Sequence, residues 1–310
     1  MQIVTVQHYD AFSTEPNKGN PAGVVVEGSQ YSEQEMQEIA RMVGFNETAF
    51  ALPSNQADIR IRYFTPGHEV DLCGHATMAT IYALQTQGFL ANKSSITIET
   101  KAGILPILLE EKQEKLYITM QHAAPQFVDF NGSKAALAQS IGLNEDELHA
   151  ELPIVYGSTG LWTLLIPVQH LASFEKMSPQ TATFPSILKE MPTASLHPFC
   201  LQAFDKSADM HARHFSSPYS GTIQDIVTGT ASGVMGAYYA KYINPEVSYP
   251  KTLVVEQGQE LDRDGRVHVH VNKVDGEVDI SITGTAVYVK EVPVTQTILT
   301  QFQTKETVLY

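Results

Sequence analysis

Two similar helix starts, half a chain apart, constrain the fold of this sequence more than any other feature. Residues 73–77, Cys-Gly-His-Ala-Thr, run into the apolar stretch MATIYALQTQG, and residues 228–232, Thr-Gly-Thr-Ala-Ser, run into GVMGAYYAKY. The two starts are 155 residues apart (228 − 73), which is half of the 310-residue chain. The same shift pairs Gly103 with Gly258 downstream of the two helices. An internal repeat on this scale predicts two structurally related halves.

Strand patterns surround both helices. Four lie before the first helix (IVTVQHY, AGVVVEG, ETAFAL and IRIRYF), two follow it (ILPILLE and KLYITM), and two follow the second (RVHVHV and VDISI). Because both helices lack a polar face, each is expected to be buried. We therefore expect an α+β fold of two pseudo-symmetric halves, each a curled mixed β-sheet or barrel around a central helix, with the active site between the halves. The expected domains are residues 1–120 and 121–310, and the extreme C-terminus is expected to pack back on the first half.

One further helix has clear ends in the sequence. Ser32 and Glu35 match a capping box, and the helix they open is expected to stop at Gly44, a typical residue after a helix C-terminus.

Charge and composition exclude several classes of protein. The chain has 20 Lys and Arg against 34 Asp and Glu, a net charge of −14, so no nucleic-acid partner is expected. No apolar run is long enough to span a membrane, and the N-terminus does not resemble a signal peptide. With only Cys73 and Cys200, a disulfide framework is not expected either. A cytoplasmic protein is the resulting expectation.

The starts of the two repeated helices are candidate binding sites. A helix N-terminus presents free N–H groups and the positive end of a dipole, and small residues such as Gly74 and Gly229 let an anion approach them. If the halves face each other, the two starts can hold one carboxylate between them. The alternative is that these glycines only permit tight packing of helix on sheet.

Three ionisable side chains are candidate catalytic groups. Glu47 stands in a short apolar strand, where a carboxyl group could take and return a proton; it could equally be an exposed carboxylate at the rim. His75 lies at the start of the first helix and Asp225 three residues before Thr228. A satisfied buried histidine and a loop residue that bonds helix N–H groups are the alternatives for these two.

No metal site is expected. His268 and His270 share a strand face, and His211 and His214 are three residues apart, but neither pair is joined by a carboxylate or cysteine at metal-site spacing. Phosphate-binding glycine loops and a G-x-S-x-G nucleophile motif are also missing from the sequence.

Five ordered blocks resemble the signature of the PhzF-like isomerase family of phenazine biosynthesis: DAFSTEPNKGNPAGVV, ETAF, RYFTPGHEVDLCGHAT, QDIVTGTASG and VEQG. The resemblance covers nearly the whole chain. It implies the diaminopimelate-epimerase fold, with two barrel-like halves around central helices, and it implies a homodimer.

The resemblance also implies roles for individual residues. Glu47 matches the family's acid/base glutamate, His75, Asp225 and Thr230 match supporting active-site positions, and Asn20 lies in the GNP loop. Ile226 departs from the proline usual after this aspartate, a change that removes no reactive group.

The related epimerases use two cysteines, one before each helix-start glycine. Here the second position is Thr228, whose hydroxyl is far too weak an acid to replace a thiol. We therefore expect a cofactor-independent isomerase that moves a proton within a small carboxylate-bearing metabolite, held by Asn20, Gly74, Gly229 and Thr230. An amino-acid epimerase that uses Glu47 and Cys73, and a non-catalytic metabolite-binding or interaction protein, are the alternatives.

Overall fold

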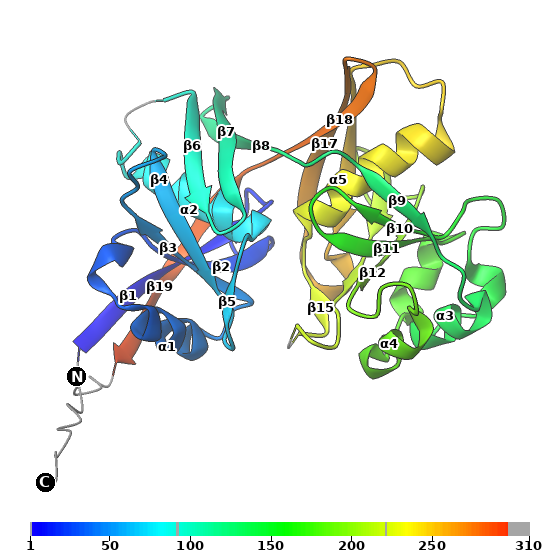
Figure 1. Cartoon of the computed structure of the whole chain (residues 1–310), viewed down its shortest axis with the longest axis horizontal. Helices are drawn as coiled ribbons and strands as arrows, with labels where there is room; N and C mark the ends of the chain where they lie inside the picture. Colours follow the sequence, from blue (N-terminus) through cyan, green and yellow to red (C-terminus); the bar gives the residue numbers. More distant parts are fainter. Residues whose placement is uncertain (1, 91–92, 221, 297–310) are drawn as a thin grey trace, which may run out of the picture.

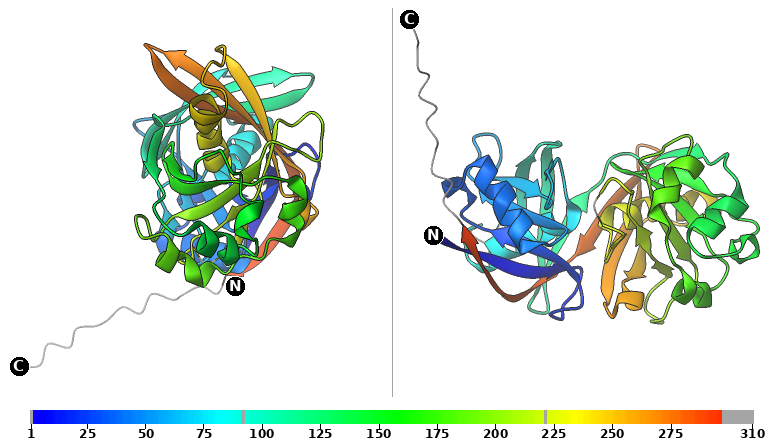
Figure 2. Two further views of the ribbon diagram at one scale, coloured as in Figure 1. Left: turned by 90° about the vertical axis from the view of Figure 1, so that its right-hand side faces the viewer. Right: turned by 90° about the horizontal axis from the view of Figure 1, so that it is seen from below.

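The computed structural model describes residues 2–90, 93–220 and 222–296, and it forms two lobes that lie side by side (Figure 1). The view from below in Figure 2 shows the same two lobes with strands passing between them. Each lobe is a curled mixed sheet around a buried helix, so the predicted α+β architecture of two related halves is confirmed.

The first lobe contains eight strands from the N-terminal part of the chain and one from the end. They are β1 (Gln2–Ala11), β2 (Asn20–Val25), β3 (Glu47–Leu52), β4 (Ile59–Phe64), β5 (Glu69–Val70), β6 (Ser95–Thr100), β7 (Gly103–Lys112), β8 (Lys115–Gln121) and β19 (Ala286–Gln296).

The second lobe contains the other ten strands of the described residues. They are β9 (Gln126–Asp129), β10 (Val155–Ser158), β11 (Trp162–Pro167), β12 (Ser195–Cys200), β13 (Met210–Ala212), β14 (His214–Phe215), β15 (Gln224–Asp225), β16 (Lys251–Gln257), β17 (Gly265–Val274) and β18 (Glu277–Gly284).

Strand pairing repeats between the lobes. In the first, β1, β2, β3, β4, β6, β7 and β8 follow one another with antiparallel, parallel, antiparallel, parallel, antiparallel and antiparallel pairings. In the second, β10, β11, β12, β13, β16, β17 and β18 follow one another in the same order of senses. The repeat seen in the sequence around the two helices therefore extends through the whole sheet order.

The central helices are α2 (Gly74–Thr86) and α5 (Gly229–Tyr238), and both are buried along almost their whole length. They contact each other across the lobes. A further turn of π-helix, Tyr239–Ile243, extends α5. Gly74 and Thr230, in the first turns of the two helices, are only partly buried, so both helix starts remain accessible.

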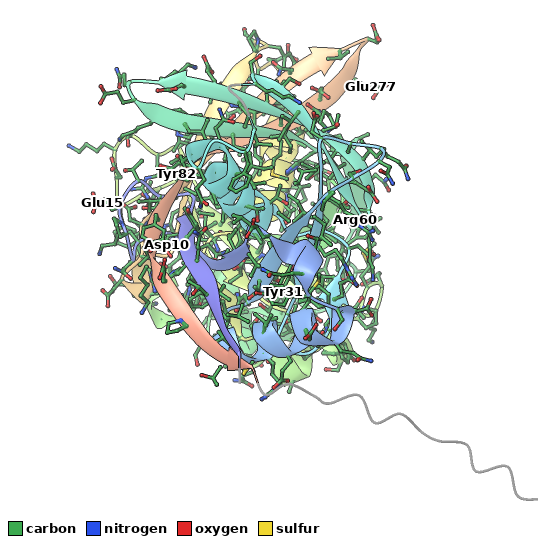
Figure 3. All side chains as sticks on the ribbon, turned by 90° about the vertical axis from the view of Figure 1, so that its left-hand side faces the viewer. Asp10, Glu15, Tyr31, Arg60, Tyr82 and Glu277 are labelled. Carbon is green, nitrogen blue, oxygen red and sulfur yellow. The ribbon has the colours of Figure 1, made fainter. Side chains whose placement is uncertain are left out.

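Further helices cover the outside of the lobes. They are α1 (Glu33–Val43), α3 (Lys134–Ser140) and α4 (Phe184–Ile187). The capping box of Ser32 and Glu35 is present, and Gly44 ends α1 with a φ of 72°, so the predicted ends of this helix are confirmed. Figure 3 looks onto the first lobe, where Tyr82 on α2 packs edge-on against Tyr9 with ring centroids 6.0 Å apart.

The lobes are connected by paired strands as well as by the chain. At the upper junction in Figure 1, β18 pairs with β8, for example Gly284 with Ile118. The chain then returns as β19, which pairs with β1 along its length. The predicted packing of the extreme C-terminus concerns residues 297–310, which lie outside the described residues. In the part of the chain that the structure describes, no helix is long and apolar enough to cross a membrane.

Candidate active site between the lobes

The start of α2 carries three chemically active side chains in contact. Cys73 is the extended residue before the helix, and Glu47 opens the neighbouring strand β3. His75 Nδ1 lies 3.4 Å from Cys73 Sγ, and His75 Nε2 lies 3.1 Å from Glu47 Oε2. The Glu47 side chain is 19% exposed, so it is partly buried beside the histidine and is not a fully exposed rim carboxylate.

The charges of this cluster follow from burial. Burial raises the pKa of the Cys73 thiol to about 11, and the neighbouring Glu47 carboxylate acts in the same direction. Burial alone would lower the pKa of His75, but its Cys73 and Glu47 neighbours raise it well above the usual value. Cys73 raises the pKa of His75 only as the thiolate. With the thiol protonated at neutral pH, Glu47 is the neighbour that favours the charged imidazole.

The raised pKa of Cys73 is the opposite of the effect that a helix start usually has on a thiol. The positive end of a helix lowers a thiol pKa, but desolvation by the packed lobe outweighs it at Cys73. Cys73 is therefore a poor base at neutral pH.

The start of α5 is organised around Asp225. Thr228, the residue before the helix, donates its hydroxyl to Asp225 Oδ2 at 2.7 Å. Gln257, fully buried at the end of β16, donates to the Asp225 carbonyl at 2.9 Å and accepts from Thr228 N–H at 3.1 Å. The residue that replaces the second cysteine of the epimerases is thus fixed by hydrogen bonds.

Asn20 and Asn46 join the two helix starts. The buried Asn20 amide donates to Asp225 Oδ1 at 2.7 Å and to the Val227 carbonyl at 2.8 Å. Asn46, next to Glu47 in the chain, donates to the same Asp225 oxygen at 3.5 Å. These contacts bring Glu47, His75, Asn20 and Asp225 into one region between the lobes.

The two helix-start glycines have different surroundings. A Cβ added at Gly74 would meet nothing within 4 Å, whereas one at Gly229 would lie 2.7 Å from Ile282 Cδ1 and 2.8 Å from Phe12 Cζ. Packing alone accounts for glycine at 229, but not at 74. Next to Gly229, the backbone carbonyl of Thr230 accepts from Thr159 Oγ1 at 3.5 Å.

The histidine pairs named from the sequence lie elsewhere. His268 and His270 are on β17, where His270 Nε2 bonds Thr283 Oγ1 at 2.8 Å. His211 is buried on β13 between Glu256 and Glu260, at 3.1 and 2.8 Å. Of the residues that the structure describes, Glu47, Cys73 and His75 are the group placed closely enough to hold a metal ion.

Two hollows in the surface lie away from this region. One of about 490 Å³ is bordered by α3 residues such as Gln139, and one of about 300 Å³ lies beside Lys18 and Arg266. Neither is lined by the candidate residues.

Sequence reasoning missed two residues of the site. Gln257 lies in the block VEQG and Asn46 stands directly before Glu47. Both act through contacts with Asp225 from distant parts of the chain, 32 and 179 residues away, and the sequence alone does not reveal these contacts.

The glycine surroundings predict different effects of one added methyl group. Gly229→Ala should destabilise the fold by about 1–3 kcal/mol, the usual cost of overpacking. Gly74→Ala should change the free energy of unfolding by less than about 1 kcal/mol, since its methyl group enters open space. Denaturant unfolding followed by circular dichroism compares the two variants. Equal losses of stability would contradict the difference in packing.

The chain is similar to several known proteins. A protein from Bacillus subtilis (strain 168) named "Uncharacterized isomerase YfhB" is 49% identical over 93% of this chain and 97% of its own length. A Bacillus anthracis "phenazine biosynthesis protein, PhzF family" has a solved structure with a TM-score of 0.93 and 56% identity, covering 96% of this chain and all of that one. The "Trans-2,3-dihydro-3-hydroxyanthranilate isomerase" of Pseudomonas aeruginosa (strain PAO1) is 28% identical over 89% of this chain and 95% of its own length.

The family described as "Phenazine biosynthesis-like protein", PhzC-PhzF, matches residues 9–292. With this match over nearly the whole chain, and with curated relatives that are named isomerases, the chain belongs to the PhzF family of isomerases.

Proposed function

We propose that this enzyme moves a proton within a small carboxylate-bearing substrate bound between the lobes, with Glu47 as the acid/base group and without a cofactor. The observation that carries the proposal is the contact of Glu47 with His75 at the open start of α2, beside the Asp225 cluster at the start of α5.

The substrate carboxylate is held by the two helix starts. Free backbone N–H groups and the helix dipoles favour an anion there. The open space before Gly74 allows close approach to the backbone. Asn20, Gly229 and Thr230 complete the binding site, and Asn20 acts mainly by fixing the start of α5 through Asp225 and Val227.

Glu47 carries the proton between two carbon atoms of the substrate. In the first step a substrate C–H bond breaks, its proton passes to a Glu47 oxygen, and the electron pair enters the π-system of the substrate. In the second step a new C–H bond forms at another carbon with the proton returned by Glu47. No electron is gained or lost overall, and His75 and the helix dipoles stabilise the charges that develop.

The substrate class is that of a cyclic or unsaturated amino or hydroxy carboxylate. The relative from Pseudomonas aeruginosa acts, by its name, on trans-2,3-dihydro-3-hydroxyanthranilate. That compound has the carboxylate and the π-system that this mechanism requires, and it is the first compound to assay here.

Replacement of Glu47 by Gln tests the acid/base role. Glu47→Gln keeps the shape of the side chain but removes the exchangeable proton, so the rate should fall at least 100-fold, within the 10²–10⁴-fold range typical of general acid–base catalysis. Carboxylate binding should stay within about tenfold of the parent, since the helix starts hold the ligand. Turnover and solvent-deuterium exchange into bound substrate measure both effects.

Glu111→Gln, an exposed carboxylate on β7, is the matched control and should behave as the parent. Deuterium exchange at the parent rate in Glu47→Gln would remove Glu47 from this role and transfer it to His75 or Asp225.

Replacement of Cys73 by Ala separates the isomerase from an epimerase that uses Glu47 and Cys73. Because burial holds the Cys73 pKa near 11 and Thr228 occupies the second cysteine position, Cys73→Ala should keep most of the activity. Steady-state kinetics decide this point. A 10³-fold loss of rate would favour the epimerase.

We also propose that the protein is cytoplasmic and that it is a homodimer, the oligomeric state that its family resemblance implies. Light scattering at micromolar concentration should give about twice the 34.1 kDa mass of the chain. A single species at the monomer mass would contradict the dimer.

A further inference from the structure

We propose that Glu47, Cys73 and His75 form a binding site for one zinc ion, which blocks the active site reversibly. This ion is an inhibitor and not a cofactor. The three side chains offer a carboxylate oxygen, a sulfur and an imidazole nitrogen, all within 4.8 Å of one another. Zinc binds these three donor types in proteins.

The spacing of the donors fits a tetrahedral ion. Zinc bonds of about 2.3 Å to sulfur and about 2.0–2.1 Å to nitrogen and oxygen place tetrahedral ligands roughly 3.5 Å apart for sulfur and nitrogen, and roughly 3.3 Å apart for nitrogen and oxygen. His75 Nε2 lies 3.1 Å from Glu47 Oε2 and 3.9 Å from Cys73 Sγ. The Glu47 and His75 donors are thus already close to their bonded separation. Cys73 Sγ lies within 4.8 Å of the other donors but faces His75 Nδ1 at 3.4 Å, so the thiol must turn toward Nε2 to complete the site.

The surroundings favour an ion over a direct contact between the side chains. Glu47 Oε2 is a buried oxygen atom that approaches His75 at 3.1 Å without forming an aligned hydrogen bond. The space in front of Gly74, which lies between Cys73 and His75 in the chain, is open. Water or a substrate carboxylate can fill the fourth position there, as in zinc sites with three protein ligands.

Charge is balanced in the bound state. The Glu47 carboxylate and a Cys73 thiolate neutralise the two charges of zinc, and His75 binds as the neutral imidazole. Binding therefore releases the thiol proton and the proton of any charged His75 to the buffer. Zinc selects this site over magnesium because magnesium prefers oxygen ligands.

Occupation of the site removes the proton acceptor of the proposed reaction. Once Glu47 binds zinc, the oxygen that takes the substrate proton is unavailable to it. Inhibition therefore rests on the proposed function, whereas zinc binding does not.

Cobalt titration tests the site without any enzyme assay. Co²⁺ replaces Zn²⁺ in such sites, and a cobalt–thiolate bond adds an intense near-ultraviolet absorption. The metal-free chain should bind one Co²⁺ with this absorption. Zn²⁺ should displace the bound Co²⁺, and the same concentration of Mg²⁺ should not. Cys73→Ala should abolish the absorption, and Cys200→Ala, the matched control at the other buried cysteine, should retain it.

A second variant keeps the test decisive if Cys73→Ala does not fold. Glu47→Gln retains the thiol and should bind Co²⁺ at least tenfold more weakly than the parent. The site would be overturned by any of three results. These are no thiolate absorption in the parent, the same absorption in Cys73→Ala, and an unchanged affinity of Glu47→Gln for Co²⁺.

The kinetic arm uses the parent enzyme with added Zn²⁺, followed by a chelator. Turnover should fall as the site fills and recover on chelation. Full activity with zinc bound would overturn the inhibitory role. A metal-free chain that binds cobalt as expected, yet turns over no carboxylate, would overturn the proposed function and leave the zinc site standing.

Discussion

The buried amide of Asn20 ties the two lobes together at the point where their central helices begin. It donates to Asp225 Oδ1 and to the Val227 carbonyl, both in the segment that leads into α5. An amide buried without partners costs a few kcal/mol, so this pair of bonds strongly favours one arrangement of the lobes. The positions of Thr228 and of the α5 start at Gly229 depend on that arrangement. Glu47 is brought close to the α5 start because its chain neighbour Asn46 also donates to Asp225.

Duplication supplies two equivalent helix starts, but their residues now differ in role. At α2, Cys73, His75 and Glu47 surround an open approach to Gly74. At α5, Thr228 and Asp225 bond each other, and Gly229 is closely packed. In the proposed mechanism one start therefore carries the proton chemistry, and the other is held by hydrogen bonds and close packing. This asymmetry suits a proton transfer that uses one acid/base group and not two.

Much of the fold could be predicted from the sequence, because the repeat, the alternating strands and the helix ends are local patterns. The strands beginning at Gln2, Glu47 and Gly265 and the capped helix α1 lie where those patterns place them. The region between β8 and α5 carried no comparable pattern. The contacts of Gln257 and Asn46 and the raised pKa of Cys73 were also beyond prediction, because they arise from packing between distant segments.

Retention of a label at the migrating hydrogen tests the central claim, a single acid/base group, most directly. Trans-2,3-dihydro-3-hydroxyanthranilate, or a better carboxylate substrate once identified, would carry deuterium at the carbon that loses its proton. The product would be analysed by mass spectrometry after partial conversion in ordinary water. Transfer by Glu47 alone predicts that part of the deuterium reappears at the new carbon, because the same carboxyl group returns it. Complete loss of the label, with inversion at one stereocentre and no bond migration, would contradict this account and indicate two separate groups.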